Sequence, residues 1–380
     1  KNALIGTVHG LGVKLLRRFA FEAGVSPRVD IIAEEDHQRL FNLSMAAVIH
    51  LDRIERIEAL CDKLGLSRDG EKYNWRKDVL RLVEIIRGNN FGPEIIEKSK
   101  RQSWQSLAKF LPPVAASPTP EQYKNRLAIA LTETAAVLTA NEADGTKKTA
   151  SAANYLRKLH GQLRRKGYLP WYEYLKLARF TKEVGAKSRE LVDAVVELGE
   201  LHPASAAFQD DLKAYQDLLF DCARDAIAEY DQYKKKRGRI DYTDMEVLVL
   251  GLLDHPGVRT TLGRELDLLM VDEFQDTSPI QLAVFLKLSE LAGQSVWVGD
   301  PKQSIYGFRG AEPRLMATVM AATGPMDPAN IQKNSWRSRE DIVYACNALF
   351  TKAFPDTPEA AVVLEPVRTR TGGKFAPAES

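Results

Sequence analysis

The amino-acid sequence predicts an α/β fold, rich in helix overall, in which a parallel-sheet core carries a large all-helical insertion. Two observations carry this prediction. From about residue 34 to residue 236, charged residues alternate with Leu, Ile, Val and Ala at spacings of three and four, as on amphipathic helices. After Gly238, two short apolar runs flank a helical pattern, which is the order strand, helix, strand.

Composition places the chain among globular proteins. Its 380 residues suggest two or three domains, and 44% hydrophobic with 27% charged residues excludes wholesale disorder. The 53 Lys and Arg nearly balance the 51 Asp and Glu, so any nucleic-acid site must be a local patch. We find no long apolar run, no signal-peptide layout and no C-x-x-C, and therefore expect a cytoplasmic protein without a membrane span, disulfide framework or zinc site.

The first residues predict a short strand followed by a helix. An apolar run at Ala3–Ile5 stops at Gly6, and the stretch Leu11–Phe21 then places its large apolar residues on one helical face, with Gly24 as the stop.

The helical region contains two predicted breaks. The stretch Leu111–Pro120 holds four prolines, and Asn141–Thr149 is polar with a turn signal. Its last helix is the longest, since apolar residues recur at spacings of four and three from Phe208 to Tyr233. We expect this helix to form one face of a bundle, and a free-standing coiled coil is the alternative.

The strand–helix–strand unit lies between residues 266 and 298. Its predicted buried strands are Leu266–Val271 and Ser295–Val298, joined by a helix that Thr277 or Ser278 caps. A right-handed crossover makes the strands parallel and brings their carboxyl ends to one edge of the sheet. Ligands of open α/β sheets bind at that edge.

Two carboxylates, Asp272 and Glu273, follow the first strand directly. Adjacent carboxylates are costly to desolvate without a cation, and Mg²⁺ bound through one carboxylate and nucleotide phosphates is a common solution. The second carboxylate could then orient or deprotonate a water that attacks the γ-phosphate. The alternative is an acidic cap on the next helix, but the context V-D-E-F-Q-D-T favours the nucleotide site.

The second strand is followed by Gln303, whose amide could hydrogen-bond a phosphate oxygen without adding charge. Tyr306 and Phe308 then alternate with small residues ahead of Arg309, a pattern that suits a stacking platform for unpaired bases. A polar loop and core packing are the respective alternatives.

Further candidates are weaker when taken singly. Arg337 precedes an amphipathic helix and could stabilise a transferring phosphoryl group. Thr7 and His9 lie at a strand-to-helix junction, where they could hold a nucleic-acid phosphate. The basic runs Lys234–Arg239 and Arg164–Lys166 could contact DNA backbone or simply complement helix ends.

Taken together, these segments resemble the UvrD/Rep group of superfamily 1 DNA helicases. The likeness is specific from Glu265 to Phe350 and from Ile5 to Arg18, whereas the middle of the chain matches in helical character and length only. The sequence D-P-K-Q-S-I-Y at residues 300–306 and the long helical insertion resemble the helicase–nuclease branch typified by AddA and RecB. The segments are T-V-H-G-L at residues 7–11, I-D-Y-T-D at 240–244, D-E-F-Q-D-T at 272–277, V-G-D-P-K-Q-S-I-Y-G-F-R-G-A at 298–311 and N-S-W-R-S at 334–338.

The resemblance implies a role for each matching residue. Asp272 would ligate Mg²⁺, Glu273 would be the general base, and Gln303 would report the γ-phosphate of ATP and couple it to DNA. The remaining implied contacts are Arg337 to the γ-phosphate, Trp336 stacked on adenine, Tyr306 and Phe308 stacked on DNA bases, Arg309 near the DNA and nucleotide, and Thr7 and His9 on single-stranded DNA.

The resemblance also implies a domain layout, with a RecA-like first domain at residues 1–33 and 238–330. Residues 34–237 would be the helical insertion, and residues 331–380 would open a second RecA-like domain. The phosphate-loop pattern G-x-x-x-x-G-K-[ST] does not occur in the sequence, and Ser335 replaces the usual Asn of the last motif. We therefore expect an internal piece of an ATP-dependent helicase of recombinational repair that alone hydrolyses ATP negligibly.

The implied partners are single-stranded and duplex DNA and a second helicase–nuclease subunit. The alternative is a non-catalytic DNA-binding or scaffolding subunit that has kept the fold without the phosphate loop.

Overall fold

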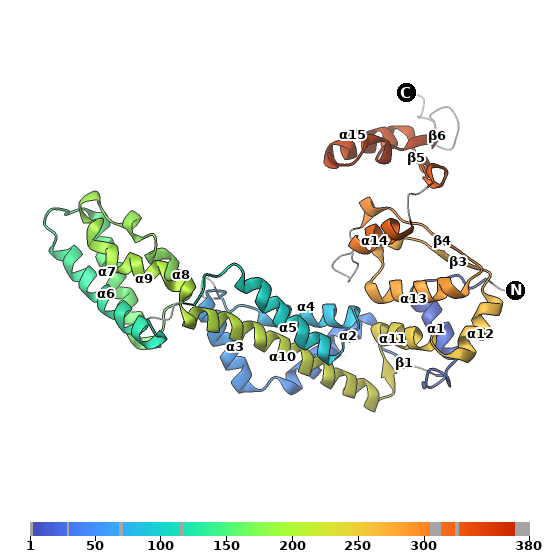
Figure 1. Ribbon diagram of the computed structural model, residues 1–380, viewed down its shortest axis with the longest axis horizontal. Helices are drawn as coiled ribbons and strands as arrows, with labels where there is room; N and C mark the ends of the chain where they lie inside the picture. Colours follow the sequence, from blue (N-terminus) through green and yellow to red (C-terminus); the bar gives the residue numbers. More distant parts are fainter. Residues whose placement is uncertain are drawn as a thin grey trace, which may run out of the picture. The chain divides into compact units, whose positions relative to one another are not determined.

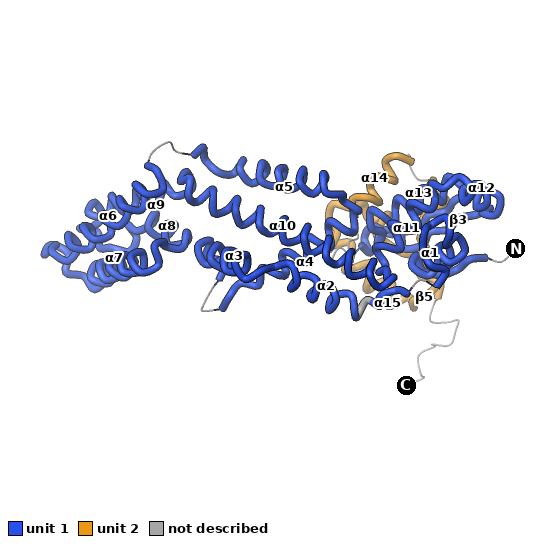
Figure 2. The backbone as a smooth tube through the Cα atoms, turned by 90° about the horizontal axis from the view of Figure 1, so that it is seen from below, with its two compact units in different colours: residues 1–312 blue, residues 313–380 orange. Residues whose placement is uncertain are grey.

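The computed structural model describes residues 3–28, 30–67, 71–114, 118–304, 313–323 and 327–368. The chain divides into two compact units, residues 1–312 and residues 313–380, which Figure 2 colours separately. None of the described helices has the combination of length and apolar character that spanning a bilayer requires.

The helices α2 to α10 occupy most of the chain between residues 34 and 236, as the sequence predicts (Figure 1). Both predicted breaks are confirmed, because helices end before each and begin again within or after it. After the proline-rich break, the next helix begins at Pro120, where Thr119 and Gln122 form a capping box. The helices are Glu34–Val48 (α2), Leu51–Leu64 (α3), Trp75–Gly88 (α4), Pro93–Ala108 (α5), Pro120–Ala140 (α6), Lys147–Lys166 (α7), Trp171–Leu177 (α8), Asp193–Glu200 (α9) and Ala206–Lys236 (α10).

Two hydrophobic cores hold these helices together. In the first, α2 to α5 pack around α10, and its fully buried side chains include Phe41, Trp75 and Tyr230. In the second, α6 to α9 pack on one another around Leu127 and Leu156. Each large apolar side chain buried in this way contributes about 1.5–3 kcal/mol.

The long helix α10 is a bundle helix, as predicted. Its 31 residues span about 46 Å at the usual rise. Phe208 near its start packs against the second core, whereas Cys222, Ala226 and Tyr230 are fully buried in the first. One amphipathic face of α10 therefore serves both cores.

The two ends of the helical region meet in a small parallel sheet. Strand β1 (Asp30–Ile31) pairs with β2 (Arg239–Ile240), and Ile32 extends the ladder with a 2.8 Å hydrogen bond from its N–H to the carbonyl of Ile240. The chain thus enters and leaves the helical region at neighbouring positions.

The predicted strand–helix–strand unit is confirmed. Strands β3 (Leu268–Val271) and β4 (Gln294–Trp297) are parallel, and α13 (Pro279–Leu291) connects them. The helix begins at a capping box in which Ser278 accepts from the N–H of Gln281. The compact unit of residues 1–312 also contains α1 (Val8–Arg18), α11 (Tyr242–Leu252) and α12 (Pro256–Glu265). Helix α11 packs against both α1 and α13.

Two expectations about strands are wrong. Residues 3–5 form no strand, and Ile5 is 85% exposed, because no described strand lies beside them to supply hydrogen bonds. The strands β3 and β4 are not buried on both faces: Leu269 and Val271 are buried, whereas Met270 is 68% exposed. Within the described ranges this sheet has two strands, and one face stays open.

The second unit is described by itself. It contains α14 (Pro313–Thr323), β5 (Asn334–Arg339), α15 (Glu340–Ala353) and β6 (Glu365–Arg368), and β5 pairs with β6 in parallel. Over the described residues the fold is therefore rich in helix, with small two-stranded parallel sheets.

Candidate active site

The two polar loops predicted to share one edge of the sheet do lie side by side. The register pairs Val271 with Trp297, so β3 and β4 end together. Beyond the strands, the N–H of Val298 donates to the carbonyl of Val271 at 2.8 Å, and the N–H of Phe274 donates to the carbonyl of Val298 at 3.0 Å. The segments that carry Asp272 with Glu273 and Gln303 therefore leave the sheet from adjacent positions.

The acidic pair sits at an open and strained turn. Asp272 and Glu273 are both exposed, and the N–H of Glu273 donates to Oδ1 of Asp272 at 3.0 Å. Glu273 has a left-handed backbone with φ of 53°, a conformation that costs a residue with a Cβ about 1–3 kcal/mol. Such strain persists only where the surroundings hold it, and it concentrates at functional sites.

Asp276, a turn further on, is the most unusual acid of this loop. Its Oδ1 is buried without a hydrogen-bond partner, and burial, followed by the negative charge of Glu273, raises the pKa of its carboxyl. Within the described ranges, no three His, Cys, Asp or Glu side chains converge to hold a metal ion. The carboxylates here could hold a cation only with help from water or a ligand.

The second loop is organised by Asp300. Its Oδ2 accepts a 3.1 Å hydrogen bond from Nε2 of Gln303, and its Oδ1 pairs with Nζ of Lys302 at 2.9 Å. Burial would raise the pKa of Asp300, but Lys302 and Gln303 outweigh it and lower that pKa. The exposed amide of Gln303 is thus tethered at the sheet edge.

Thr7 and His9 lie at the start of α1. Thr7 caps the helix, since its Oγ1 accepts from the N–H of Gly10 at 3.1 Å. The ring of His9 stacks on Tyr242 at 4.3 Å, and its Nε2 lies 3.2 Å from the buried Oε1 of Glu246. His9 keeps an exposed side, with 41% of its side chain accessible.

Glu246 also links the start of α1 to the start of α13, the helix that follows Asp272 and Glu273. Its Oε1 accepts a second hydrogen bond, 2.7 Å long, from Nε2 of Gln281, which belongs to the capping box at the start of α13. Sequence reasoning did not single out Glu246, Gln275 or Asp300 as site residues. Gln275 and Asp300 could have been found, because each lies inside one of the two polar segments that follow the strands, whereas no sequence signal marks Glu246.

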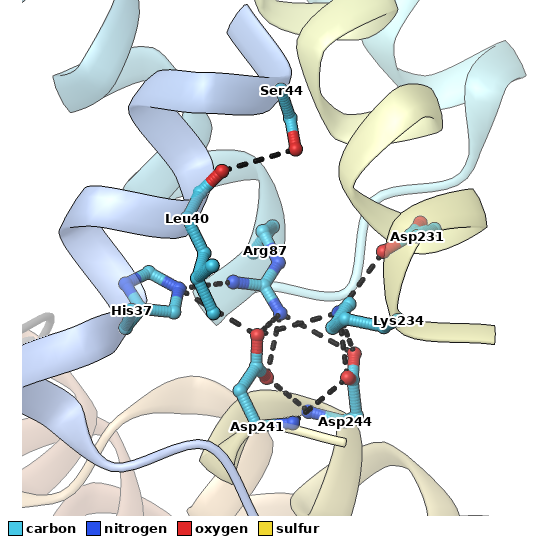
Figure 3. A network of polar contacts seen from close by, with 8 residues as sticks. All are labelled: His37, Leu40, Ser44, Arg87, Asp231, Lys234, Asp241 and Asp244. Atoms are coloured by element: carbon cyan, nitrogen blue, oxygen red, sulfur yellow. Dashed lines mark hydrogen bonds and ion pairs between the residues drawn. The ribbon is translucent and has the colours of Figure 1, made fainter. Parts of the chain in front are cut away.

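A buried ion network anchors α11 to the helical region (Figure 3). Nη2 of Arg87 on α4 lies 2.6 and 2.7 Å from the two carboxylate oxygens of Asp241, the N-cap of α11. Nζ of Lys234 on α10 lies 2.6 Å from Asp244 and 3.3 Å from Asp241. Nζ of Lys234 also lies 3.1 Å from Oδ1 of Asp231, whose side chain is 55% exposed. Two cations and three carboxylates are thereby gathered where α10 is followed by β2 and α11.

Neighbouring side chains complete the network. Arg87 also contacts Nε2 of His37 at 2.9 Å. Burial lowers the pKa of His37, and Arg87 and Lys234 act in the same direction, whereas Asp241 and Asp244 oppose the shift. For Asp241, burial would raise the pKa, but Arg87 and Lys234 hold it at about 2. Lys234, the first residue of the basic run proposed for DNA, is therefore buried in ion pairs and unavailable to a phosphate.

Other predicted residues fall elsewhere. Trp336 and Arg337 lie on β5 of the second unit, both exposed, with Trp336 at 68%. Tyr306, Phe308 and Arg309 lie outside the described residues. The sequence G-A-K-S at residues 185–188 has part of the phosphate-loop pattern without its glycine spacing. A Cβ at Gly185 would lie 2.3 Å from Oδ2 of Asp144, and a carboxylate so close disfavours an anion there.

Residues 1–322 match the family model of the UvrD/REP helicase N-terminal domain, and the chain belongs to this family. Among curated relatives, it is 32% identical over 154 residues to the RecBCD enzyme subunit RecB of Mycolicibacterium smegmatis, covering 40% of this chain and 14% of that protein. It is 39% identical over 142 residues to an ATP-dependent helicase/nuclease subunit of Natranaerobius thermophilus, covering 35% of this chain and 11% of the relative.

The exonuclease/helicase subunit RexA of Lactococcus lactis subsp. cremoris is 32% identical over 193 residues, covering 46% of this chain and 16% of RexA. The predicted likeness to the helicase–nuclease branch is confirmed by these relatives. The chain spans between 11% and 16% of the length of the three relatives.

Proposed function

We propose that this chain forms part of an ATP-dependent translocase on single-stranded DNA that unwinds duplexes in recombinational repair. The observation that supports this most is the juxtaposition of Asp272 and Glu273 with the loop that carries Gln303, at the carboxyl ends of two parallel strands. Nucleotides bind at such edges.

The proposed domain layout is a RecA-like first domain at residues 1–33 and 238–330, interrupted by a helical insertion at 34–237. The pairing of β1 with β2 favours it, because it closes the helical region at its two ends. Residues 331–380 would open a second RecA-like domain, whose Trp336 would stack on adenine and whose Arg337 would contact the γ-phosphate.

Each site residue then has a chemical task. Glu273, held in its left-handed turn, would orient and deprotonate the attacking water, and Gln303 would sense the terminal phosphate. The exposed carboxylate of Asp272 fits Mg²⁺, which favours one or two carboxylates completed by water and phosphate oxygens. When bound, the ion would neutralise charge on the transferring phosphoryl group.

The DNA would contact Thr7 and His9 and stack on Tyr306 and Phe308, beside Arg309. The exposed side of His9 and its fixed stacking on Tyr242 suit a phosphate contact. The relatives' names favour a partner that is a second component of a helicase–nuclease complex. Since the sequence holds no phosphate-loop pattern, the chain alone should turn over ATP negligibly.

The test uses the full-length protein that carries this chain and measures ATP hydrolysis stimulated by single-stranded DNA. Glu273→Gln should lower kcat by about 10²–10⁴, the usual value of a positioned base, and leave DNA affinity unchanged. The matched control is Glu290→Gln on α13, whose carboxylate is 62% exposed and which should keep wild-type turnover. Wild-type turnover in Glu273→Gln would contradict the assignment, and absence of turnover in the unsubstituted protein would favour a non-catalytic role.

A further inference from the structure

The side chain of Gln275 is buried between the two loops of the candidate site, and only 2% of the residue is exposed. Its Nε2 donates to Oε2 of Glu273 at 2.5 Å, and its Oε1 accepts from the N–H of Asp300 at 2.9 Å. Its backbone carbonyl accepts from Oγ of Ser304 at 3.2 Å. One amide side chain thus bonds both loops.

The surroundings fix this amide in place. A Cβ at Gly299 would lie 2.8 Å from Oε1 of Gln275 and 3.2 Å from Cβ of Phe274, so the close approach of the second loop depends on a glycine. A primary amide is the group that can donate on one side and accept on the other. Glu at this position would lose the donor, and Met would lose both groups.

The bonds continue beyond Asp300, whose Oδ2 accepts from Nε2 of Gln303. A continuous series therefore runs from the carboxylate of Glu273 through Gln275 and Asp300 to the amide of Gln303. No member of the series between Glu273 and Gln303 needs to touch a ligand.

We propose that Gln275 is a positioning residue that couples the orientation of Glu273 to the position of the loop bearing Gln303. This inference rests on the proposed function, in which Glu273 is the base and Gln303 the phosphate sensor. Movement of Gln303 toward a terminal phosphate displaces Asp300, and the buried amide transmits that displacement to the carboxylate of Glu273. The base is then aligned only when the phosphate is in place.

The first experiment needs no catalysis and uses the 380-residue chain. Hydrogen exchange of the Asp300 amide is measured by NMR in the unsubstituted chain, in Gln275→Met, in Glu273→Ala and in the double variant. Loss of a hydrogen bond of this kind should speed exchange about tenfold or more. Glu273→Ala should also speed it, because Gln275 loses its anchor, but should have no further effect in the Gln275→Met background.

The matched control is Gln294→Met, since this glutamine is exposed at the start of β4, and it should leave Asp300 exchange unchanged. Unaltered protection of Asp300 in Glu273→Ala, or strictly additive effects in the double variant, would overturn the coupling. Protection of α11 and α13 in every variant verifies that the chain is folded.

The second experiment measures kcat and KM of DNA-stimulated ATP hydrolysis by the full-length protein. Gln275→Met should lower kcat at least about tenfold while KM for ATP stays within about twofold, which marks a group acting in the transition state. Gln275→Glu keeps an acceptor for Asp300 but sets a charge against Glu273, and should lower kcat at least as far. Unchanged kcat in both variants would overturn the positioning role while the proposed function stands. If the unsubstituted protein hydrolyses no ATP, the proposed function fails, and the exchange cycle alone decides whether the two loops are coupled.

Discussion

The buried ion network between α4, α10 and α11 allows a quantitative prediction. The side chain of Arg87 is 9% exposed and that of Asp241 is 3% exposed, so both charges are largely shielded from water. Arg87→Met leaves Lys234 facing Asp241, Asp244 and the more exposed Asp231, so the buried carboxylate of Asp241 loses its closest cation. Breaking a buried pair in this way costs about 3–5 kcal/mol.

The neutral variant of the partner acid completes a double-mutant cycle. Asp241→Asn keeps an oxygen to cap α11, where Oδ1 accepts from the N–H of Asp244, but removes the carboxylate that lies closest to Arg87. In the double variant Lys234 keeps its pair with Asp244 and with the more exposed Asp231, and neither Arg87 nor Asp241 is left as a buried charge without its partner. The double variant should therefore be at least about 1.5 kcal/mol more stable than the sum of the single effects.

The assay is urea-dependent hydrogen exchange, which reports the local free energy of unfolding, of peptides from α4 and residues 230–246 and, for the control, of peptides from α1 and α12. The matched control is Arg18→Met, which removes a pair with Glu265 whose side chains are 44% and 48% exposed, and which should cost below about 1 kcal/mol. Additive losses in the cycle, or a loss in Arg87→Met no larger than in Arg18→Met, would refute the claim that these charges are buried and mutually compensated.

Two more predictions concern acid and packing. Because the folded pKa of Asp241 is about 2 and its unfolded value is about 3.9, its contribution to stability is complete above pH about 4 and is lost as pH falls toward 2. Urea unfolding between pH 5 and 2 should show this loss, and Asp241→Asn should flatten the slope in that window; an equal slope would contradict it. Gly199 lets α9 approach α8, since a Cβ there would lie 2.2 Å from the backbone N of Ala178, so Gly199→Ala should cost about 1–3 kcal/mol in thermal unfolding. Gly251→Ala on α11 meets open space and should be neutral or stabilising, and equal effects of the two substitutions would be inconsistent with this packing.

Much of the fold could be predicted because it depends on local periodicity. The spacing of apolar residues predicted the long helix α10, and the proline-rich stretch ahead of Pro120 predicted a break. The apolar runs on either side of α13 predicted two parallel strands, and hence the shared edge on which Asp272 and Gln303 lie. The parallel direction of the two strands follows from the right-handed crossover rule, which needs no knowledge of contacts remote in sequence.

What could not be predicted depends on partners remote in sequence. Lys234 belongs to a basic run and looks like a surface residue until Asp241 and Asp244 surround it. Arg87 and Asp241 are separated by 154 positions, and no periodicity links them. The open face of β3 was missed for a related reason, because an apolar run predicts a strand but does not say whether a second layer covers it.

The role of Gln275 was also beyond sequence reasoning. The residue lies inside the polar segment that follows β3, but its importance comes from Asp300, which the fold brings to its side chain. The pairing of β3 with β4 sets the distance between Gln275 and Asp300.

The central claim, that the acidic pair and Gln303 face one nucleotide, is tested most directly by locating Mg²⁺ and the terminal phosphate. An experimental structure of the full-length protein with a non-hydrolysable ATP analogue, Mg²⁺ and single-stranded DNA would do so. We predict Mg²⁺ bound by Asp272 at about 2.1 Å or through one water, with the amide of Gln303 within hydrogen-bond distance of the γ-phosphate. A nucleotide bound away from the carboxyl ends of β3 and β4 would contradict the account.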